Sequence, residues 1–270
     1  EPPSPPAAAS GSAVAAVQAG TASAARSVGR GAGKVILLGE HAVVYGVPAI
    51  ALGIDRGAEA VAQSLPPLPR AEGETVDSRA SRLRVPAWHI DVTDEDESHD
   101  LARAFRAVLA ATFQGARIVP SSAGAASSSR LPVLVEAHAS LPPGGGLGCS
   151  AALGVAVARA LDPSASPKIV RERAMEWERV FHGNPSGVDS AMAAGRGVAV
   201  FERGKPLESL ILGAPLVLVV GHSGAASSTK AMVSSVARQY EDDPAGVGTI
   251  WDAIAVLVTS AKAALVAGDV

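Results

Sequence analysis

Residues 131–161 read LPVLVEAHASLPPGGGLGCSAALGVAVARAL, and this stretch decides the fold. Alternating apolar and polar residues predict a half-buried strand over 131–139, and an Ala-rich run predicts a helix from about Cys149 to Leu161. The glycines between them let backbone N–H groups approach a ligand, and the helix behind them adds the positive end of its dipole. This pattern indicates a phosphate site, but a glycine-rich turn with a capping serine accounts for it equally well.

The chain before this stretch is rich in short apolar runs typical of strands. These runs predict strands over 35–38, 41–45 and 48–54, and a hairpin from 82–85 and 88–92. A helix is expected over Leu101–Phe113.

The chain after this stretch mixes helices with strands. Apolar residues at helical spacing predict a helix from Pro167 to His182, with proline at a favourable first position. The remaining elements are strands at 198–201 and 216–220 and helices at 227–240 and 247–267. Without a strict alternation of strand and helix, the fold class is α+β.

Composition bounds the function classes. The chain has 270 residues, 48% of them apolar, with 23 basic and 26 acidic side chains. This balance argues against nucleic-acid binding, and a single cysteine excludes an internal disulfide framework. No run of about 18 uninterrupted apolar residues occurs, so we expect no transmembrane helix, no membrane partner and a cytoplasmic location. Residues 1–28, rich in Ala, Pro and Ser, are expected to be a disordered tail.

Several familiar motifs are nearly present but fail. Residues 29–34 resemble a P-loop, yet Val35 stands where Ser or Thr is needed for Mg²⁺, and the lysine opens a strand. The six histidines show no spacing typical of zinc ligands. Residues 221–225 lack the last glycine of a hydrolase elbow, which leaves a serine hydrolase as a distant alternative.

Charged residues outside the loop form further candidate clusters. Glu178 lies on the flank of a helical apolar stripe, where a bound cation would offset its charge, and Asp189 follows a tight turn. Lys34 opens the first strand, and Glu40 and His41 follow its end. A capping cluster at 227–230 opens a later helix. Each signal also has an ordinary structural interpretation: a solvated charge at an element edge or a helix cap.

Together these segments resemble the GHMP family of small-molecule kinases. KVILLGEHAVVYGVPAIALGID looks like its first motif, PPGGGLGCSAALGVAVA like its ATP loop, and GHSGAASSTKAMV like a segment on the substrate side. ERVFHGNPSGVDSAM discriminates best, because it is more similar to mevalonate kinases than to other members. The resemblance covers about residues 29–270.

The resemblance implies a two-domain α+β fold. Its N-terminal domain, over 29–212, would be like part of ribosomal protein S5, and a ferredoxin-like C-terminal domain, over 213–270, would be incomplete. It also implies transfer of phosphate from ATP to the primary hydroxyl of (R)-mevalonate, with Mg²⁺ as cofactor. Small molecules would be the partners, and a homodimer stays open.

The resemblance also implies roles for individual residues. Asp189 would take the hydroxyl proton with Lys34 beside it, and Ser150 and Glu178 would hold Mg²⁺. The substrate would be bound by Glu40, His41, Ser228 and Thr229. The ATP phosphates would be wrapped by Pro143, Gly144, Gly145, Gly146, Leu147, Gly148, Cys149 and Ser150.

The sequence departs from the family pattern at two points. Cys149 stands where the family usually has serine, and no glycine-rich third motif occurs before Val270. Another GHMP kinase, or a non-catalytic member that keeps the ATP loop, therefore stays as an alternative.

Overall fold

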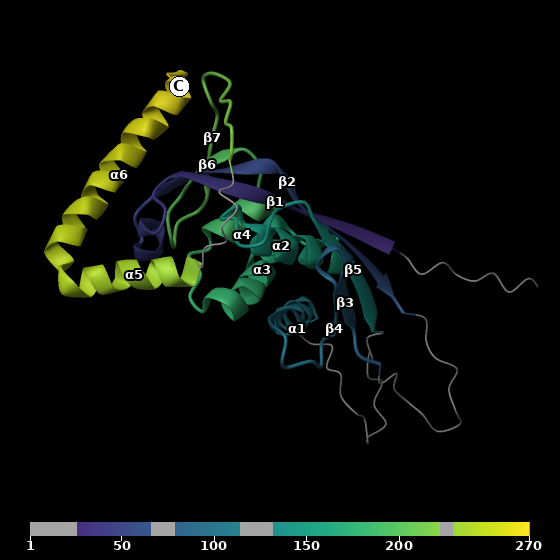
Figure 1. Ribbon diagram of the computed structural model, residues 1–270. Helices are drawn as coiled ribbons and strands as arrows, with labels where there is room; N and C mark the ends of the chain where they lie inside the picture. Colours follow the sequence, from purple (N-terminus) through teal and green to yellow (C-terminus); the bar gives the residue numbers. More distant parts are fainter. Residues whose placement is uncertain (1–25, 66–78, 114–131, 222–228, 270) are drawn as a thin grey trace, which may run out of the picture.

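Two long antiparallel strands, β1 (Arg26–Leu38) and β2 (Ala49–Ser64), organise the structure (Figure 1). The computed structural model describes residues 26–65, 79–113, 132–221 and 229–269. The order β4-β3-β5-β2-β6-β7, with β1 beside β2, makes β2 the central strand of the sheet. The other strands are β3 (Arg82–Val85), β4 (Ile90–Thr93), β5 (Val133–Ala139), β6 (Val198–Phe201) and β7 (Glu208–Leu210).

Helix α2 (Cys149–Leu161) lies directly against β1 and β2, and α1 (Asp100–Thr112) and α3 (Pro167–His182) pack around it (Figure 1). The small residues of α2 allow this close approach, and a Cβ added at Gly31 of β1 would lie 2.1 Å from the Ala152 carbonyl oxygen. The main core forms at this contact, where side chains as large as those of Trp177 and Phe105 are fully buried.

A second, smaller core joins α4 (Val188–Ala194) to the sheet. Met192 of α4 packs with Phe201 of β6 and with Val43 of η1, a 3₁₀ helix over Ala42–Tyr45. This core holds the turn after β1 against the start of α4, and both segments carry predicted site residues.

The chain ends in two helices, α5 (Thr229–Asp242) and α6 (Pro244–Ala267). Aromatic rings join them to η1: the ring centroid of Trp251 is 4.5 Å from that of Tyr45 and 4.6 Å from that of Tyr240. Helix α6 also contacts the sheet, because Val258 and Leu265 pack with Ile50 in a third apolar cluster.

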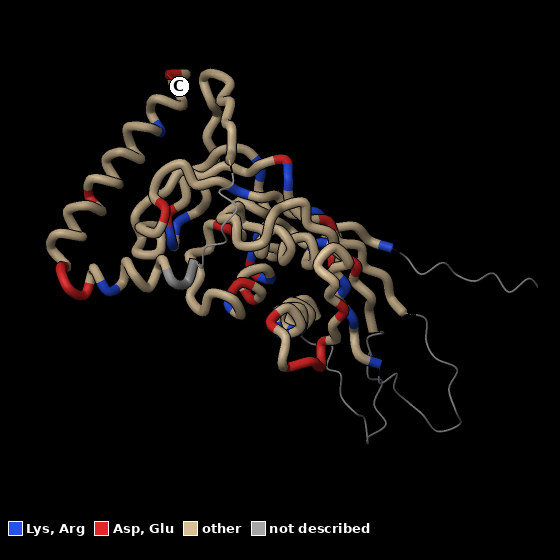
Figure 2. The backbone as a smooth tube through the Cα atoms, viewed as in Figure 1, with Lys and Arg blue, Asp and Glu red and all other residues tan. Residues whose placement is uncertain are grey.

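Helix α6 bears on the expectation that the chain has no transmembrane helix. By length and composition it could cross a membrane, since its charged residues are limited to Asp252 and Lys262 (Figure 2). The helix is not an uninterrupted apolar run, and length and composition alone do not make it a membrane span. In the structure one side of α6 packs on the sheet, and Lys262 Nζ pairs with Glu208 Oε1 of β7 at 2.5 Å.

The α+β class is confirmed, and three local expectations are corrected. Residues 41–45 form a turn and η1 instead of a strand, because Gly39 and His41 take positive φ. Residues 216–220 form no strand, and no neighbouring strand among the described residues pairs with them. Strand β1 begins at Arg26, so the last three residues of the expected tail belong to the sheet. Residues 1–25 lie outside the described ranges.

Candidate active site

The glycine-rich loop connects the end of β5 to the start of α2. Gly148 has φ +70° directly before α2, and a Cβ at this position would lie 2.9 Å from Lys34 Cγ, so glycine alone fits without strain. The backbone N–H of Lys34 donates to the Leu147 carbonyl oxygen at 2.9 Å. The loop is therefore fastened to β1 beside the N-terminus of α2.

Cys149 occupies the first position of α2 and is buried. Its thiol donates to the Leu141 carbonyl oxygen at 3.5 Å. Burial, and to a lesser extent the charge of Glu178, raises the pKa of the thiol to about 11. The thiol is protonated at neutral pH, so Cys149 packs in the loop and is not an activated nucleophile.

Lys34 and Asp189 form an ion pair, with Lys34 Nζ 3.1 Å from Asp189 Oδ1. The lysine side chain is 6% exposed and the aspartate 32%. Burial alone would lower the pKa of Lys34, but the charges of Asp189 and Glu40 outweigh it and the pKa is raised. Lys34 therefore keeps a permanent positive charge against the Asp189 carboxylate, which the first turn of α4 holds in place.

Glu178 is a buried carboxylate in α3 and is only 2% exposed. Ser150 Oγ donates to its Oε1 at 2.6 Å, and the indole N–H of Trp177 donates to Ser150 Oγ at 3.2 Å. His182, one turn further along α3, places Nε2 3.4 Å from Oε2. Burial first, and then the negative charge of Asp189, raise the pKa of Glu178 to about 8. The hydrogen bond from Ser150 and the positive charge of Lys34 oppose this shift but do not outweigh it.

A divalent cation fits this arrangement. Ser150 and Glu178 supply two oxygen donors, and Mg²⁺ prefers oxygen ligands and usually keeps waters and substrate phosphates as its remaining ligands. Among the described residues no group of three or more His, Cys, Asp or Glu side chains could hold a metal ion. The donor set therefore suits Mg²⁺ that is shared with a phosphate-bearing ligand.

Glu40 and His41 lie in the turn between β1 and η1. The guanidinium of Arg203, from the turn after β6, braces this region: Nη1 donates to the Val44 carbonyl oxygen at 3.1 Å and Nη2 donates to Asn184 Oδ1. Asn184 belongs to the loop that precedes Asp189. Arg203 therefore links the segment carrying Glu40 and His41 to the segment carrying the Asp189 carboxylate.

Most of the predicted site residues line one cavity of about 170 Å³. The predicted site residues that line it are Lys34, Glu40, His41, Gly144, Gly145, Gly146, Gly148, Cys149, Ser150, Glu178 and Asp189. Two predicted loop residues do not line the cavity, because Pro143 is exposed and the Leu147 side chain packs against the main core. Ser228 and the side chain of Thr229 lie outside the described part of the chain.

The cavity also includes residues that the sequence analysis did not single out. His182 lies four residues after Glu178, on the same face of α3, and this spacing could have identified it from the sequence. Burial and the charge of Lys34 lower the pKa of His182 against the opposing effect of Asp189, which favours a neutral imidazole. Ser186 and Val233 carried no signal, since only the folded chain brings them to the cavity.

Comparisons with known proteins agree with this geometry. The family model described as the GHMP kinases N terminal domain matches residues 100–197. The mevalonate kinase of Thermococcus sibiricus is 31% identical over 241 residues, which cover 87% of this chain and 68% of that protein. The mevalonate kinase of Pyrococcus horikoshii is 32% identical over 238 residues, covering 85% and 66%.

A solved structure of similar fold is that of the L. major mevalonate kinase in complex with R-mevalonate. It has a TM-score of 0.64 and 23% identity, and the match covers 90% of this chain and 70% of that one. The fold and the glycine loop are thus those of the GHMP kinases. Within that class, the chain belongs to the mevalonate kinase family, and it spans about two thirds of the length of the curated relatives it matches.

Proposed function

We propose that the protein catalyses ATP-dependent phosphorylation of the primary hydroxyl of (R)-mevalonate. One observation carries the proposal: a carboxylate and a permanently charged ammonium, Asp189 and Lys34, stand 3.1 Å apart in the cavity that the glycine loop borders. Phosphoryl transfer depends mainly on positioning the reactants and neutralising phosphate charge, and these groups are suited to both tasks.

In the proposed mechanism, Asp189 Oδ accepts the proton of the mevalonate hydroxyl while that oxygen attacks the γ-phosphorus of ATP. The bond from the γ-phosphorus to the bridging oxygen breaks, and ADP leaves with that oxygen. The ammonium of Lys34 orients the Asp189 carboxylate, and it offsets the charge of the transferring group. A positioned base of this kind typically contributes about 10²–10⁴-fold.

The glycine loop would bind the ATP phosphates through backbone N–H groups at the start of α2. Ser150 and Glu178 would hold Mg²⁺, which would neutralise phosphate charge when bound. Glu40 and His41 would bind the hydroxyl and carboxylate end of the substrate. Ser228 and Thr229 would approach from the part of the chain beyond residue 213, which we propose as the start of a second domain.

The test is substrate selectivity. ADP release would be measured with mevalonate, galactose, homoserine and phosphomevalonate at equal concentration, with and without Mg²⁺. The proposal expects turnover with mevalonate that exceeds turnover with the other three and that requires Mg²⁺. Preference for another substrate would assign a different GHMP kinase. ATP binding without turnover on any of them would point to a non-catalytic member.

A further inference from the structure

A larger cavity, of about 420 Å³, lies outside the candidate active site. It forms where β1 is the one described strand that pairs with β2: β6 pairs with residues 49–52 and β5 with residues 58–64, so residues 53–57 pair with neither β5 nor β6. The C-terminal end of α4 borders it, through residues 193–197. It shares no lining residue with the active-site cavity.

The two cavities lie at opposite ends of the same helices. Cys149 and Asp189, in the first turns of α2 and α4, face the active site, whereas Arg159 and Ala194, in their last turns, face the larger cavity. A ligand bound at Arg159 is therefore separated from the glycine loop by most of the length of α2.

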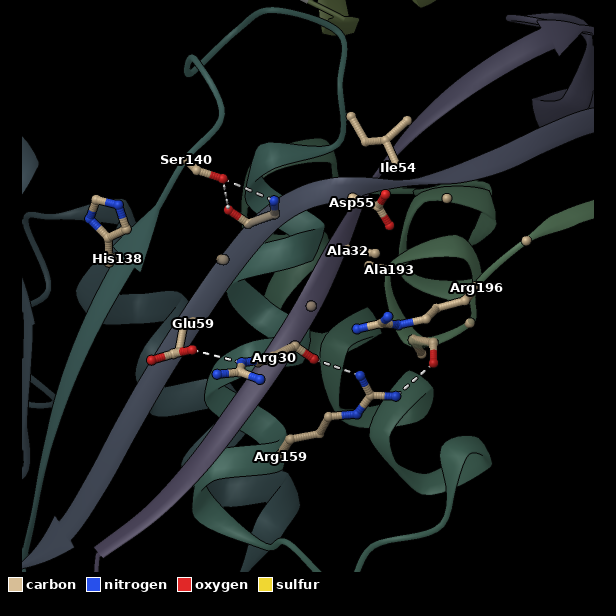
Figure 3. Close-up of a pocket in the computed structure, with 17 residues that line it drawn as sticks. Arg30, Ala32, Ile54, Asp55, Glu59, His138, Ser140, Arg159, Ala193 and Arg196 are labelled. Carbon is tan, nitrogen blue, oxygen red and sulfur yellow. Dashed lines mark hydrogen bonds and ion pairs between the residues drawn. The ribbon is translucent and has the colours of Figure 1, made fainter. Parts of the chain in front are cut away.

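Three guanidinium groups converge on this cavity, from Arg30, Arg159 and Arg196 (Figure 3). Arg30 Nε is neutralised by Glu59 Oε2 at 2.7 Å. Arg159 is held rigidly, since its two terminal nitrogens donate to the carbonyl oxygens of Arg30, at 2.5 Å, and Ala194, at 2.6 Å. These bonds orient the Arg159 guanidinium but bring it no negative charge.

Arg196 extends from the end of α4 toward the Arg159 guanidinium (Figure 3). Burial and then the positive charge of Arg196 lower the pKa of Arg159, as expected for two neighbouring cations. Within the described part of the chain, neither arginine has a carboxylate within ion-pair distance. Asp55 lines the same cavity without pairing to either of them.

Two adjacent, unneutralised guanidinium groups beside an open cavity favour an anion. Their planar N–H donors match the oxygens of a carboxylate or phosphate, and such charge-assisted hydrogen bonds are stronger than neutral ones. An anion between them would also replace repulsion by attraction. The cavity is large enough for a small metabolite in addition to its charged group.

We propose that this cavity is a second ligand site, which binds a small metabolite bearing a phosphate or carboxylate group between Arg159 and Arg196. The rigid Arg159 would orient the anion, and the exposed Arg196 would close over it. The site does not depend on the kinase reaction, because it uses none of the residues assigned to that reaction.

The test variant is Arg196→Gln. Arg196 is exposed and makes no ion pair within the described residues, so its loss should leave the fold intact. The matched control is Arg56→Gln, which removes an exposed arginine of β2 that does not line the cavity. Pyrophosphate and citrate, as phosphate and carboxylate probes, would be titrated by calorimetry into each protein in metal-free buffer.

Hydrogen exchange would show where each probe binds, because pyrophosphate could also bind the glycine loop. The proposal expects protection of residues 53–59 and 193–197, with the probe dissociation constant raised at least fivefold by Arg196→Gln and unchanged by Arg56→Gln. The stronger of the two probes identifies the charged group of the natural ligand. Protection confined to residues 142–150, or equal weakening by both variants, would overturn the proposal.

Discussion

Charged side chains have different surroundings at the two ends of α2. At its N-terminus the charged groups are buried and paired: Glu178 with the Ser150 hydroxyl, and Lys34 with Asp189. At its C-terminus Arg159 is bonded, among the described residues, only to backbone carbonyls, and the neighbouring Arg196 is exposed. Buried charges need partners that are fixed by the fold, whereas exposed charges are largely screened by water. The first end therefore suits the proposed phosphoryl transfer, and the second suits the proposed anion site.

The largest expected effect is the loss of activity when Asp189, the proposed base near the N-terminus of α2, is replaced. Asp189→Asn keeps the size of the side chain but removes the proton acceptor, so kcat should fall by about 10²–10⁴-fold. ATP binding should be retained, as measured by calorimetry, because the glycine loop is untouched. A variant that kept near-normal turnover would remove Asp189 from the role of base.

The pKa of Glu178 predicts how the stability of the protein changes with pH. Its pKa is raised to about 8 from an ordinary 4.5, so the folded protein binds more protons than the unfolded chain between these values. The metal-free protein should therefore lose stability as pH rises from about 4.5 to 8, by at most about 5 kcal/mol from this group. Urea unfolding of wild type and Glu178→Gln at several pH values measures the difference.

Bound Mg²⁺ with ATP should reverse this trend, because a cation favours the ionised carboxylate. In Glu178→Gln both the pH dependence and the effect of Mg²⁺ should disappear. An unchanged pH profile in this variant would show that another group is responsible.

Arg203 links two segments that carry predicted active-site residues, and it does not line the cavity itself. Arg203→Gln removes its donations to Val44 and Asn184, and we expect kcat/KM for mevalonate to fall about tenfold, with most of the change in KM. Lys205→Gln is the matched control, since this nearby lysine pairs only with Glu202 in the same turn. Hydrogen exchange should rise in residues 39–47 and 182–189 together. A loss of activity without that rise would contradict a bracing role.

At the C-terminal end of α2, replacing Arg159 is expected to change stability and not turnover. Arg159→Gln removes two hydrogen bonds that fasten β1 and α4 to the helix, and the free energy of unfolding should fall by about 1–2 kcal/mol. Turnover of the remaining folded protein should be unchanged, as measured at a temperature well below its Tm. A specific loss of kcat would show that the two ends of α2 are coupled.

The smallest effect is expected at Cys149. Cys149→Ser supplies a hydroxyl of similar size that can still donate to the Leu141 carbonyl oxygen. Because the thiol is neutral and packed in the loop, kcat and KM for ATP should change by less than about threefold. A large change in KM for ATP would mean that the sulfur itself shapes the loop.

The sequence predicted the elements around the glycine loop closely. The helices begin and end where expected at Cys149–Leu161 and Pro167–His182, because their apolar periodicity and helix-start signals agree. The errors lie where tertiary context decides. Residues 41–45 are apolar enough for a strand, but positive φ at Gly39 and His41 turns the chain, and this could not be inferred from apolar content.

The site was predictable where separate local signals combined into a resemblance to one family. The glycine loop, Lys34, Glu178 and Asp189 were each marked by local pattern, and the structure brings them to one cavity. The arginine pair at Arg159 and Arg196 was not predictable, because the two residues are distant in the chain and each looks like an ordinary surface charge. The roles given to all the site residues, Ser228 and Thr229 included, remain predictions.

The ring stack of Tyr45, Tyr240 and Trp251 has an optical and mechanical consequence. Tyr45 is the last residue of η1, directly after the turn with Glu40 and His41. Displacement of the two terminal helices must therefore separate the rings or drag η1 with them. Since Trp251 emission depends on its neighbours, a change in its fluorescence would report whether these helices stay packed against the turn with Glu40 and His41.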